Sequence, residues 1–238
     1  MNSDTQSTFK GARKDEGLQS IVDNDKNKWY RPVSLLTALV CTIFIISFAV
    51  VLTLNFKPLY YFDISHLKIT ETSGMTEGEI RENYDALIDY NSVFYSGELE
   101  FPTLDMSETG QIHFEEVKAI FCAFQYLCMG SFLIGLVLVI FQLRRRRYGF
   151  LKVTAALSVL LPVALGLLIA LNWERAFVLF HEVFFDNDYW IFDAATDPVI
   201  TILPDEFFMH CAVMILACIL AGSLLCLLAA RLLGKRRA

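Results

Sequence analysis

The chain has 238 residues, of which 55% are hydrophobic and 19% are charged, and its formal net charge at pH 7 is −6. This apolar composition excludes a largely disordered protein, and the net negative charge argues against a protein that binds nucleic acid through a basic surface. All six cysteines fall within apolar stretches. We therefore expect neither a disulfide framework in the loops nor a cysteine-based metal site.

Residues 1–30 are polar, lack apolar periodicity and are predicted to form a disordered cytoplasmic tail. Residues 31–238 are predicted to form one all-α membrane domain. Within it, four apolar stretches are long enough to cross a hydrocarbon core of ~30 Å, which takes about 20 helical residues. These predicted spans run approximately over residues 33–54, 117–143, 153–173 and 207–233.

Basic residues are unevenly distributed among the segments that flank these spans. Fifteen of the twenty lie in the N-terminal segment up to Arg31, in the link 144–152 and in the tail 231–237. Because basic residues accumulate on the cytoplasmic side, both termini are predicted to lie in the cytoplasm. Segments 55–116 and 174–206, which hold twenty-one of the twenty-six acidic residues, then form the two outer loops of a multi-pass protein of the cell membrane.

The first outer loop is predicted to contain an amphipathic helix. Thr76 and Glu79 have the spacing of a capping box. Apolar residues then recur at helical spacing, at Ile80, Tyr84, Leu87 and Ile88. We expect a helix from residue 77 to about residue 90 whose apolar face lies against the bundle or the lipid headgroups. Packing is the simpler role for Tyr84, and contact with a ligand is the alternative.

The second outer loop is unusually apolar near its start. Eight of the ten residues from 176 to 185 are apolar, yet the segment is too short to span a membrane, a pattern typical of an interfacial or re-entrant helix. Further along, Asp197 and Pro198 have the order of an N-cap and a first-turn proline, which predicts a short helix through Leu203. This loop is expected to fold back onto the membrane surface.

Two histidines are candidates for acid–base chemistry at this outer surface. His113 precedes the second predicted span, and His181 lies on the apolar segment of the second outer loop. Imidazole, with an unperturbed pKa of about 6.5, serves both as base and as acid near neutrality. Glu116, one helical turn after His113, is a candidate for orienting that ring, and Glu182 and Asp186 are candidates beside His181. The alternative is a solvated His113 and a His181 that only fills the interior.

Two other functions are compatible with the same residues. One is a metal-dependent membrane hydrolase in which His113, Glu116 and His181 bind zinc. The other is a non-catalytic sensor or scaffold whose acidic outer face binds a cationic partner. A transporter is disfavoured because the spans lack interior charges. His66 and His210 have no distinctive surroundings and are interpreted as structural or solvated.

Three blocks of the chain resemble a family of bacterial four-span membrane proteins, the lipoprotein intramolecular transacylases (Lit). The first block is residues 74–90, with the segment Thr76-Glu77-Gly78-Glu79. The second is Ile112-His113-Phe114-Glu115-Glu116-Val117-Lys118, where the family has His-Met-x-Asp-Val. The third begins with Phe180-His181-Glu182-Val183-Phe184-Phe185 and runs through Trp190 and Asp197 to Leu203-Pro204-Asp205-Glu206-Phe207-Phe208. The similarity extends from about residue 35 to 230.

The resemblance implies an acyltransferase of the Gram-positive cell membrane in which His113 and His181 are catalytic. Trp190, Asp197 and Tyr84, which lie in the matching blocks, are expected to support the site. The implied reaction moves the sn-2 acyl chain of a diacylglyceryl-cysteine to the α-amine of the cysteine and leaves a lyso-form lipoprotein. The implied partners are a diacylated lipoprotein N-terminus and phospholipid at the extracytoplasmic face. No cofactor and no metal are expected, because exchange of an ester for an amide is favourable.

Overall fold

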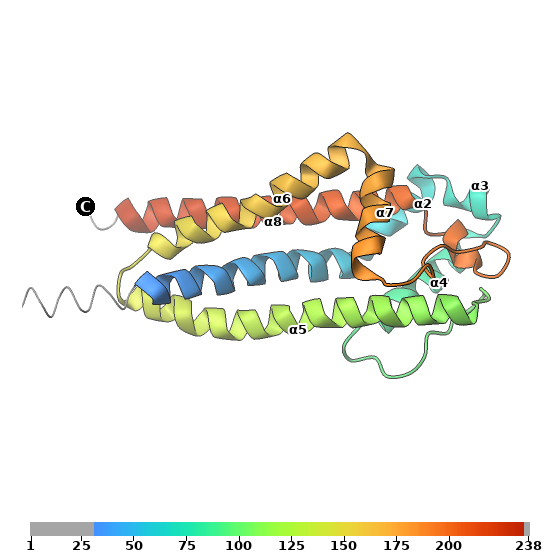
Figure 1. Cartoon of the computed structure of the whole chain (residues 1–238), viewed down its shortest axis with the longest axis horizontal. Coiled ribbons are helices and arrows are strands. Elements are labelled where there is room, and N and C mark those ends of the chain that lie inside the picture. Colours follow the sequence, from blue (N-terminus) through green and yellow to red (C-terminus); the bar gives the residue numbers. More distant parts are fainter. Residues whose placement is uncertain (1–30, 236–238) are drawn as a thin grey trace, which may run out of the picture.

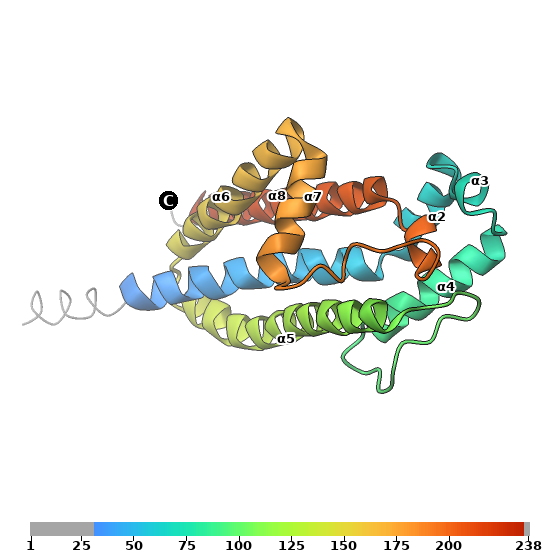
Figure 2. The same cartoon turned by 45° about the vertical axis from the view of Figure 1, so that its right-hand side comes forward.

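The computed structural model describes residues 31–235, and every regular element within that range is a helix. The predicted disordered tail, residues 1–30, lies outside the described residues. Four helices are long and apolar enough to cross a membrane, which confirms the four predicted spans. They are the first spanning helix (Arg31–Asn55), α5 (Glu108–Arg144), α6 (Gly149–Leu171) and α8 (Asp205–Lys235). Figures 1 and 2 show them running lengthwise in one bundle.

Small polar side chains connect the spanning helices to one another. Gln142 on α5 donates to the hydroxyl of Thr37 on the first spanning helix at 3.3 Å. Thr154 on α6 donates to a backbone carbonyl of that same helix, and Ser223 on α8 donates to a carbonyl of α6 at 3.0 Å. All four side chains are buried. Such bonds hold apolar helices in register where the hydrophobic effect between them is weak.

The helix α5 is much longer than a bilayer requires. Its 37 residues correspond to about 55 Å at 1.5 Å per residue, against a hydrocarbon core of ~30 Å. The first turns are polar, and the apolar run begins only at Val117. The side chain of Ser107 caps this end by accepting from the backbone N–H of Gly110 at 3.0 Å. His113 therefore lies on a regular helix that extends beyond the apolar run.

The shorter helices gather at the end of the bundle opposite to the described chain ends (Figures 1 and 2). They are α2 (Lys57–His66), α3 (Ile69–Ser73), α4 (Glu77–Tyr90) and the 3-10 helix η1 (Pro198–Thr201). The amphipathic helix predicted for the first outer loop is confirmed as α4, and its capping box between Thr76 and Glu79 is present on both sides. The sequence analysis did not predict α2 or α3.

A hydrophobic core joins α2, α4, η1 and the start of α8. Tyr84 of α4 is buried in it and stacks on Tyr60 of α2, with ring centroids 3.7 Å apart, while the edge of Phe207 meets both rings. Burial raises the pKa of the Tyr84 phenol. Tyr84 therefore has the packing role, and the rings that it contacts are those of Tyr60 and Phe207.

Candidate active site

The helix α7 (Trp173–Phe184) brings His181 to α5. It forms where the interfacial helix was predicted, and the side chain of Asn172 caps it by accepting from the backbone N–H of Arg175 at 2.8 Å. In Figures 1 and 2, α7 lies across the bundle and descends from the far end of α6 toward α5. The residues that follow α7 then run over the first turns of α5.

The two predicted catalytic histidines meet in the structure. The ring centroids of His113 and His181 are 6.2 Å apart, and the ring planes differ by 31°. His113 is 5% exposed, and His181 is partly exposed. This separation is compatible with a single reacting group that lies within hydrogen-bond reach, about 2.6–3.2 Å, of both rings.

Aromatic rings enclose both imidazoles. Phe185 and Phe192, from the segment after α7, meet the His113 ring edge-on at centroid distances of 4.7 and 5.5 Å. Trp190 stacks on the His181 ring at 4.6 Å with the planes 27° apart. The supporting role predicted for Trp190 thus has a structural basis, whereas Phe185 and Phe192 were not predicted. These rings exclude water and favour the neutral form of a buried imidazole.

A backbone hydrogen bond determines which nitrogen of His181 carries the proton. Its Nδ1 lies 2.8 Å from the carbonyl oxygen of Phe177, one turn earlier on α7. Because a carbonyl oxygen only accepts, Nδ1 donates, and Nε2 of the neutral ring keeps its lone pair. Burial lowers the pKa of His181, and the bond to Phe177 opposes that shift without cancelling it. The His181 imidazole is therefore mostly neutral at pH 7, with the lone pair of Nε2 unprotonated.

The predicted carboxylate partners of the histidines do not bind them. Glu116 accepts a hydrogen bond from the side-chain amide of Asn187 at 2.9 Å, and Nδ1 of His113 has no hydrogen-bond partner within the described chain. Glu182 and Asp186 are exposed. Neither makes a hydrogen bond to His181, whose Nδ1 bonds to the Phe177 carbonyl. The structure therefore shows no hydrogen bond between these three carboxylates and the histidines, and their orienting roles stay predictions.

Asp197 performs a different task from the one predicted. It stands at the N-cap position of η1, but its side chain makes no capping bond there. Instead its carboxylate accepts from the backbone N–H of Ser107 at 2.8 Å and from the hydroxyl of Thr196 at 2.8 Å. Asp197 is buried and touches the first turn of α5 at Gly110, where a Cβ atom would overlap its Oδ1 atom. It fastens the second loop onto α5, one turn before His113.

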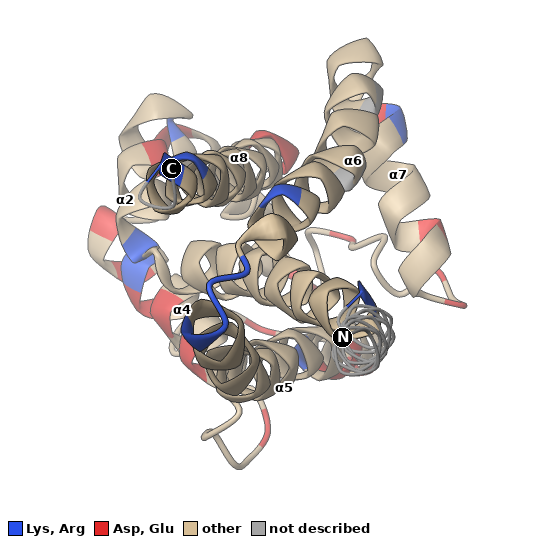
Figure 3. Cartoon of the chain, turned by 90° about the vertical axis from the view of Figure 1, so that its left-hand side faces the viewer, with Lys and Arg blue, Asp and Glu red and all other residues tan. Residues whose placement is uncertain are grey.

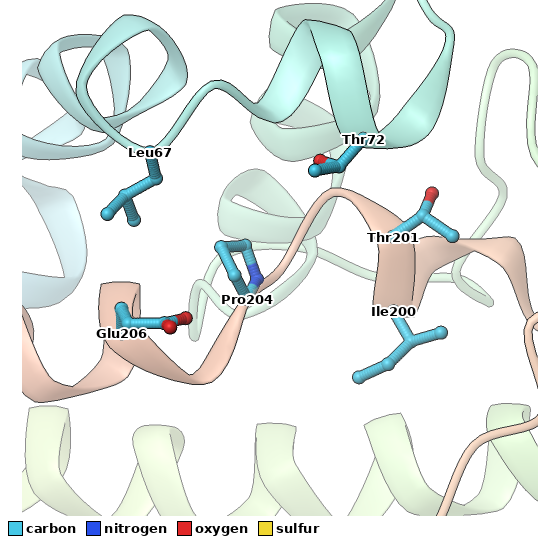
Figure 4. A pocket seen from close by; sticks show the side chains of 6 residues that line it. All are labelled: Leu67, Thr72, Ile200, Thr201, Pro204 and Glu206. Carbon is cyan, nitrogen blue, oxygen red and sulfur yellow. The ribbon is translucent and has the colours of Figure 1, made fainter.

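The other two histidines have the structural surroundings that the sequence analysis expected. His210 on α8 places Nδ1 2.9 Å from the buried carboxylate of Asp63 on α2, which ties these helices together. The ring of His66 lies 5.9 Å from that of His210. A nearby pocket lies between α3, η1 and the start of α8 (Figure 4). It contains none of the histidines and is lined by Leu67, Thr72, Ile200, Thr201, Pro204 and Glu206.

The zinc alternative finds no support in the side-chain arrangement. Across residues 31–235, no three side chains of His, Cys, Asp or Glu are grouped so that they would hold a metal ion. The trio of His113, Glu116 and His181 is not assembled as a ligand set, because Glu116 turns toward Asn187. The two imidazoles instead lie near one another, with aromatic rings in contact with both.

Comparison with known proteins decides the family. Residues 35–208 match the family model described as lipoprotein intramolecular transacylase Lit. The chain belongs to this family. No curated protein sequence matched. A solved structure of the membrane-integral Lit from Bacillus cereus is 43% identical with a TM-score of 0.87, and the alignment covers 89% of this chain and 98% of that one.

Two further Bacillus cereus Lit structures carry a substitution of one histidine. The histidine-to-arginine variant is 41% identical with a TM-score of 0.79, over 95% of this chain and 98% of that one. The histidine-to-alanine variant is 42% identical with a TM-score of 0.81, over 89% and 96%. The chain is thus an integral membrane acyltransferase, a lipoprotein intramolecular transacylase with four spans.

Proposed function

We propose that this Lit family member moves the sn-2 acyl chain of a diacylglyceryl-cysteine to the α-amine of the same cysteine, and that His113 and His181 transfer the proton. The observation that carries the proposal is the meeting of these two rings, 6.2 Å apart, from helices distant in the sequence. The lyso-form lipoprotein is the product. Exposed apolar side chains on α7, such as Val183 and Phe184, suit a substrate whose acyl chains remain in the bilayer.

The reaction joins two parts of one molecule. Attack of the amine nitrogen on the ester carbonyl closes an eight-membered ring through Cα, Cβ, sulfur, two glycerol carbons, the ester oxygen and the carbonyl carbon. Closing such a ring is a problem of orientation, which a shaped site eases. The C–N bond forms, the C–O bond of the ester breaks, and one proton passes from nitrogen to the glycerol oxygen.

His181 and His113 each carry out one step of that proton transfer. Nε2 of His181 has the free lone pair, so this ring accepts the proton that the amine nitrogen loses. Burial keeps both rings neutral at rest, so the proton that the glycerol oxygen receives is replaced by the one taken from the amine. His113, facing His181, gives its own ring proton to the departing oxygen and regains one from protonated His181, which leaves both rings neutral again. Each proton transfer of this kind is worth roughly 10²- to 10⁴-fold in rate.

The proposed topology places this site outside the cell. Figure 3 looks at the end of the bundle where the described chain begins and ends, and Lys and Arg lie on those helix ends and on the turn between α5 and α6. The positive-inside tendency assigns that end to the cytoplasm. The histidines, near the opposite end, then face the outer leaflet, where diacylated lipoproteins are anchored.

The topology is tested by labelling single introduced cysteines with a membrane-impermeant maleimide in intact cells. Phe94 is 87% exposed and Asp188 is exposed, so Phe94→Cys and Asp188→Cys give accessible probes, with Arg146→Cys on the turn after α5 as the inner control. The six native cysteines are partly buried on spanning helices, which makes the parent chain the blank. If the inner control is labelled and the two outer probes are not, the orientation is the opposite of the proposed one.

The function is tested by mass spectrometry of lipoprotein N-termini. Expression in a host that makes diacylated lipoproteins is expected to give N-acylated cysteines with one acyl chain left on the glycerol. Chelator treatment is expected to leave this conversion unchanged, because proton transfer through imidazoles needs no metal. Unchanged lipoprotein termini, in cells that contain the folded protein, refute the proposed reaction.

A further inference from the structure

Among residues 31–235, only one of the two carboxylate oxygens of Glu116 has a hydrogen-bond partner. One oxygen accepts from the side-chain amide of Asn187 at 2.9 Å. The other oxygen, Oε2, is buried and has no hydrogen-bond partner among residues 31–235. Leaving a buried charged acceptor unpaired costs more than the usual ~1–3 kcal/mol of an unsatisfied polar atom. Such an atom indicates a donor that arrives with a ligand.

The neighbouring residues supply no cation to this oxygen. Lys118, the nearest basic residue in the sequence, holds its Nζ 4.1 Å from the centre of the Tyr90 ring and donates to the carbonyl of Tyr95. Asp186 and Asp188, on either side of Asn187, are exposed carboxylates that add negative charge. The potential around Oε2 therefore favours a cationic donor.

Glu116 is held between two segments that carry the histidine pair and its contacts. Glu116 is one helical turn after His113 on α5. Its partner Asn187 comes two residues after Phe185, whose ring contacts His113 at 4.7 Å. A second hydrogen bond, from the backbone N–H of Tyr189 to the side-chain oxygen of Asn187 at 3.0 Å, fixes the amide so that its NH₂ group points to Glu116. The carboxylate is thus held in place next to the acid–base pair.

We propose that Glu116 binds the α-ammonium group of the lipoprotein's N-terminal cysteine and so selects substrates whose N-terminus is free. The inference rests on the proposed function, in which this amine is the nucleophile. An ammonium group carries three N–H donors, one for Oε2 and two for other acceptors. A free α-amine has a pKa of about 8 and is mostly protonated at pH 7, so the group that first enters the site is the cation.

The ion pair has opposite effects on binding and on chemistry. It attracts the ammonium ion, which lowers KM, but it also stabilises the protonated amine, which cannot attack the ester. Glu116→Gln keeps the acceptor for Asn187 and removes the charge. We expect this variant to raise KM by roughly 10- to 100-fold, the usual effect of losing a hydrogen bond to a charged group, with kcat unchanged or higher. A residue that only held the loop in place would lower kcat instead.

The sharper measurement is binding of two analogues that cannot react. Both are cysteinyl peptides with two ether-linked alkyl chains on the glycerol; one has a free α-amine and the other is N-acetylated. At pH 7 the protein is expected to prefer the free amine by roughly 10-fold or more. Glu116→Gln is expected to abolish the preference, while Glu115→Gln, the same charge change on an exposed neighbour, retains it.

The pH dependence gives a test that needs no variant. The preference for the free amine is expected to disappear between pH 7 and 9.5 as the amine loses its proton. His181 does not titrate in this window, because burial lowers its pKa. Equal binding of the two analogues at pH 7, or the same loss in Glu115→Gln as in Glu116→Gln, overturns the inference. Because the analogues carry no ester, that result is independent of whether the protein transfers acyl chains.

Discussion

Nδ1 of His181 donates to the backbone carbonyl of Phe177 at 2.8 Å, one turn earlier on the same helix. This bond links the orientation of the imidazole to the backbone of α7. It directs Nε2 away from the helix axis and leaves that nitrogen without a proton in the neutral ring. The partner that orients the base is thus a main-chain group, which no substitution of a neighbouring side chain removes.

The pH dependence of acyl transfer is expected to reflect the buried state of His181. Burial lowers the pKa of this imidazole, so the ring stays neutral and usable as a base below pH 6.5. Protonation of His181 is therefore expected to reduce kcat only below the 6.5 of an unperturbed histidine, whereas the α-amine of the substrate, with a pKa of about 8, titrates above it. Turnover of a diacylglyceryl lipopeptide between pH 4.5 and 8 measures it. A fall in kcat centred at or above pH 6.5 that belongs to His181, separate from that of the amine, would contradict the neutral, desolvated base.

The lowered pKa of His181 also makes the stability of the folded protein depend on pH. When the unfolded chain binds a proton near pH 6.5 and the folded chain does not, the free energy of unfolding falls as pH drops from 6.5 toward the lower folded pKa. The midpoint of thermal unfolding in detergent is expected to decrease over this interval. His181→Phe keeps an aromatic ring in place but cannot titrate, so the slope is expected to be shallower in this variant. An identical slope would assign the dependence to other groups.

Replacing either histidine is expected to remove most of the activity. His113→Ala and His181→Ala should each lower kcat by roughly 10²- to 10⁴-fold. The double variant is expected to be hardly worse than either single one, because groups that pass one proton act as a unit. Lipoprotein mass spectra and the amount of membrane-inserted protein are the two readouts. His66→Ala is the matched control, and full activity in a single site variant would remove that residue from the mechanism.

Local sequence signals identified the parts of the fold that depend on a few neighbouring residues. The capping box of Thr76 and Glu79 marked the first residue of α4, and the length of each apolar run marked the spans. The predicted span began at Val117, where the apolar run starts, whereas the helix α5 itself starts at Glu108. Polarity determines where a helix enters the membrane, whereas capping determines where it begins.

The arrangement of the site was much less accessible from the sequence. Position at the outer surface and the family resemblance both indicated His113 and His181, while spacing along the chain suggested carboxylates that make no hydrogen bond to them. Glu116 does lie one turn from His113, but its partner is Asn187, 71 positions away in an irregular segment. No periodic pattern encodes contacts of such a segment, because each depends on the tertiary path of the chain. The aromatic contacts of Phe185 and Phe192 were missed for this reason.

Trp190 is expected to influence the reaction because its indole covers the His181 ring. Its indole stacks on His181 at 4.6 Å, and aromatic contacts of this kind contribute about 0.5–1.5 kcal/mol. Trp190→Ala should therefore lower kcat/KM by roughly 2- to 10-fold and move the acid limb of kcat toward pH 6.5, because water then reaches the imidazole. Trp190→Phe should retain most of both properties. An unchanged pH profile in Trp190→Ala would show that the stacking does not desolvate His181.

The contact between Gly110 and Asp197 predicts that Gly110→Ala changes the free energy of unfolding in opposite directions with and without the Asp197 side chain. Alanine at position 110 suits a helix better than glycine by up to about 1 kcal/mol, but its Cβ atom would overlap the Asp197 carboxylate. Gly110→Ala is therefore expected to lower the free energy of unfolding by about 1–3 kcal/mol, the usual cost of overpacking.

In an Asp197→Ala background the overlap disappears, and the same Gly110→Ala change is expected to be neutral or stabilising. Thermal unfolding of the two single variants and the double variant in one detergent gives the coupling energy between the positions. Acyl transfer is expected to follow stability in Gly110→Ala, because the second loop then shifts from α5 one turn before His113. Additive effects in the cycle would show that Asp197 and the start of α5 do not touch in the membrane.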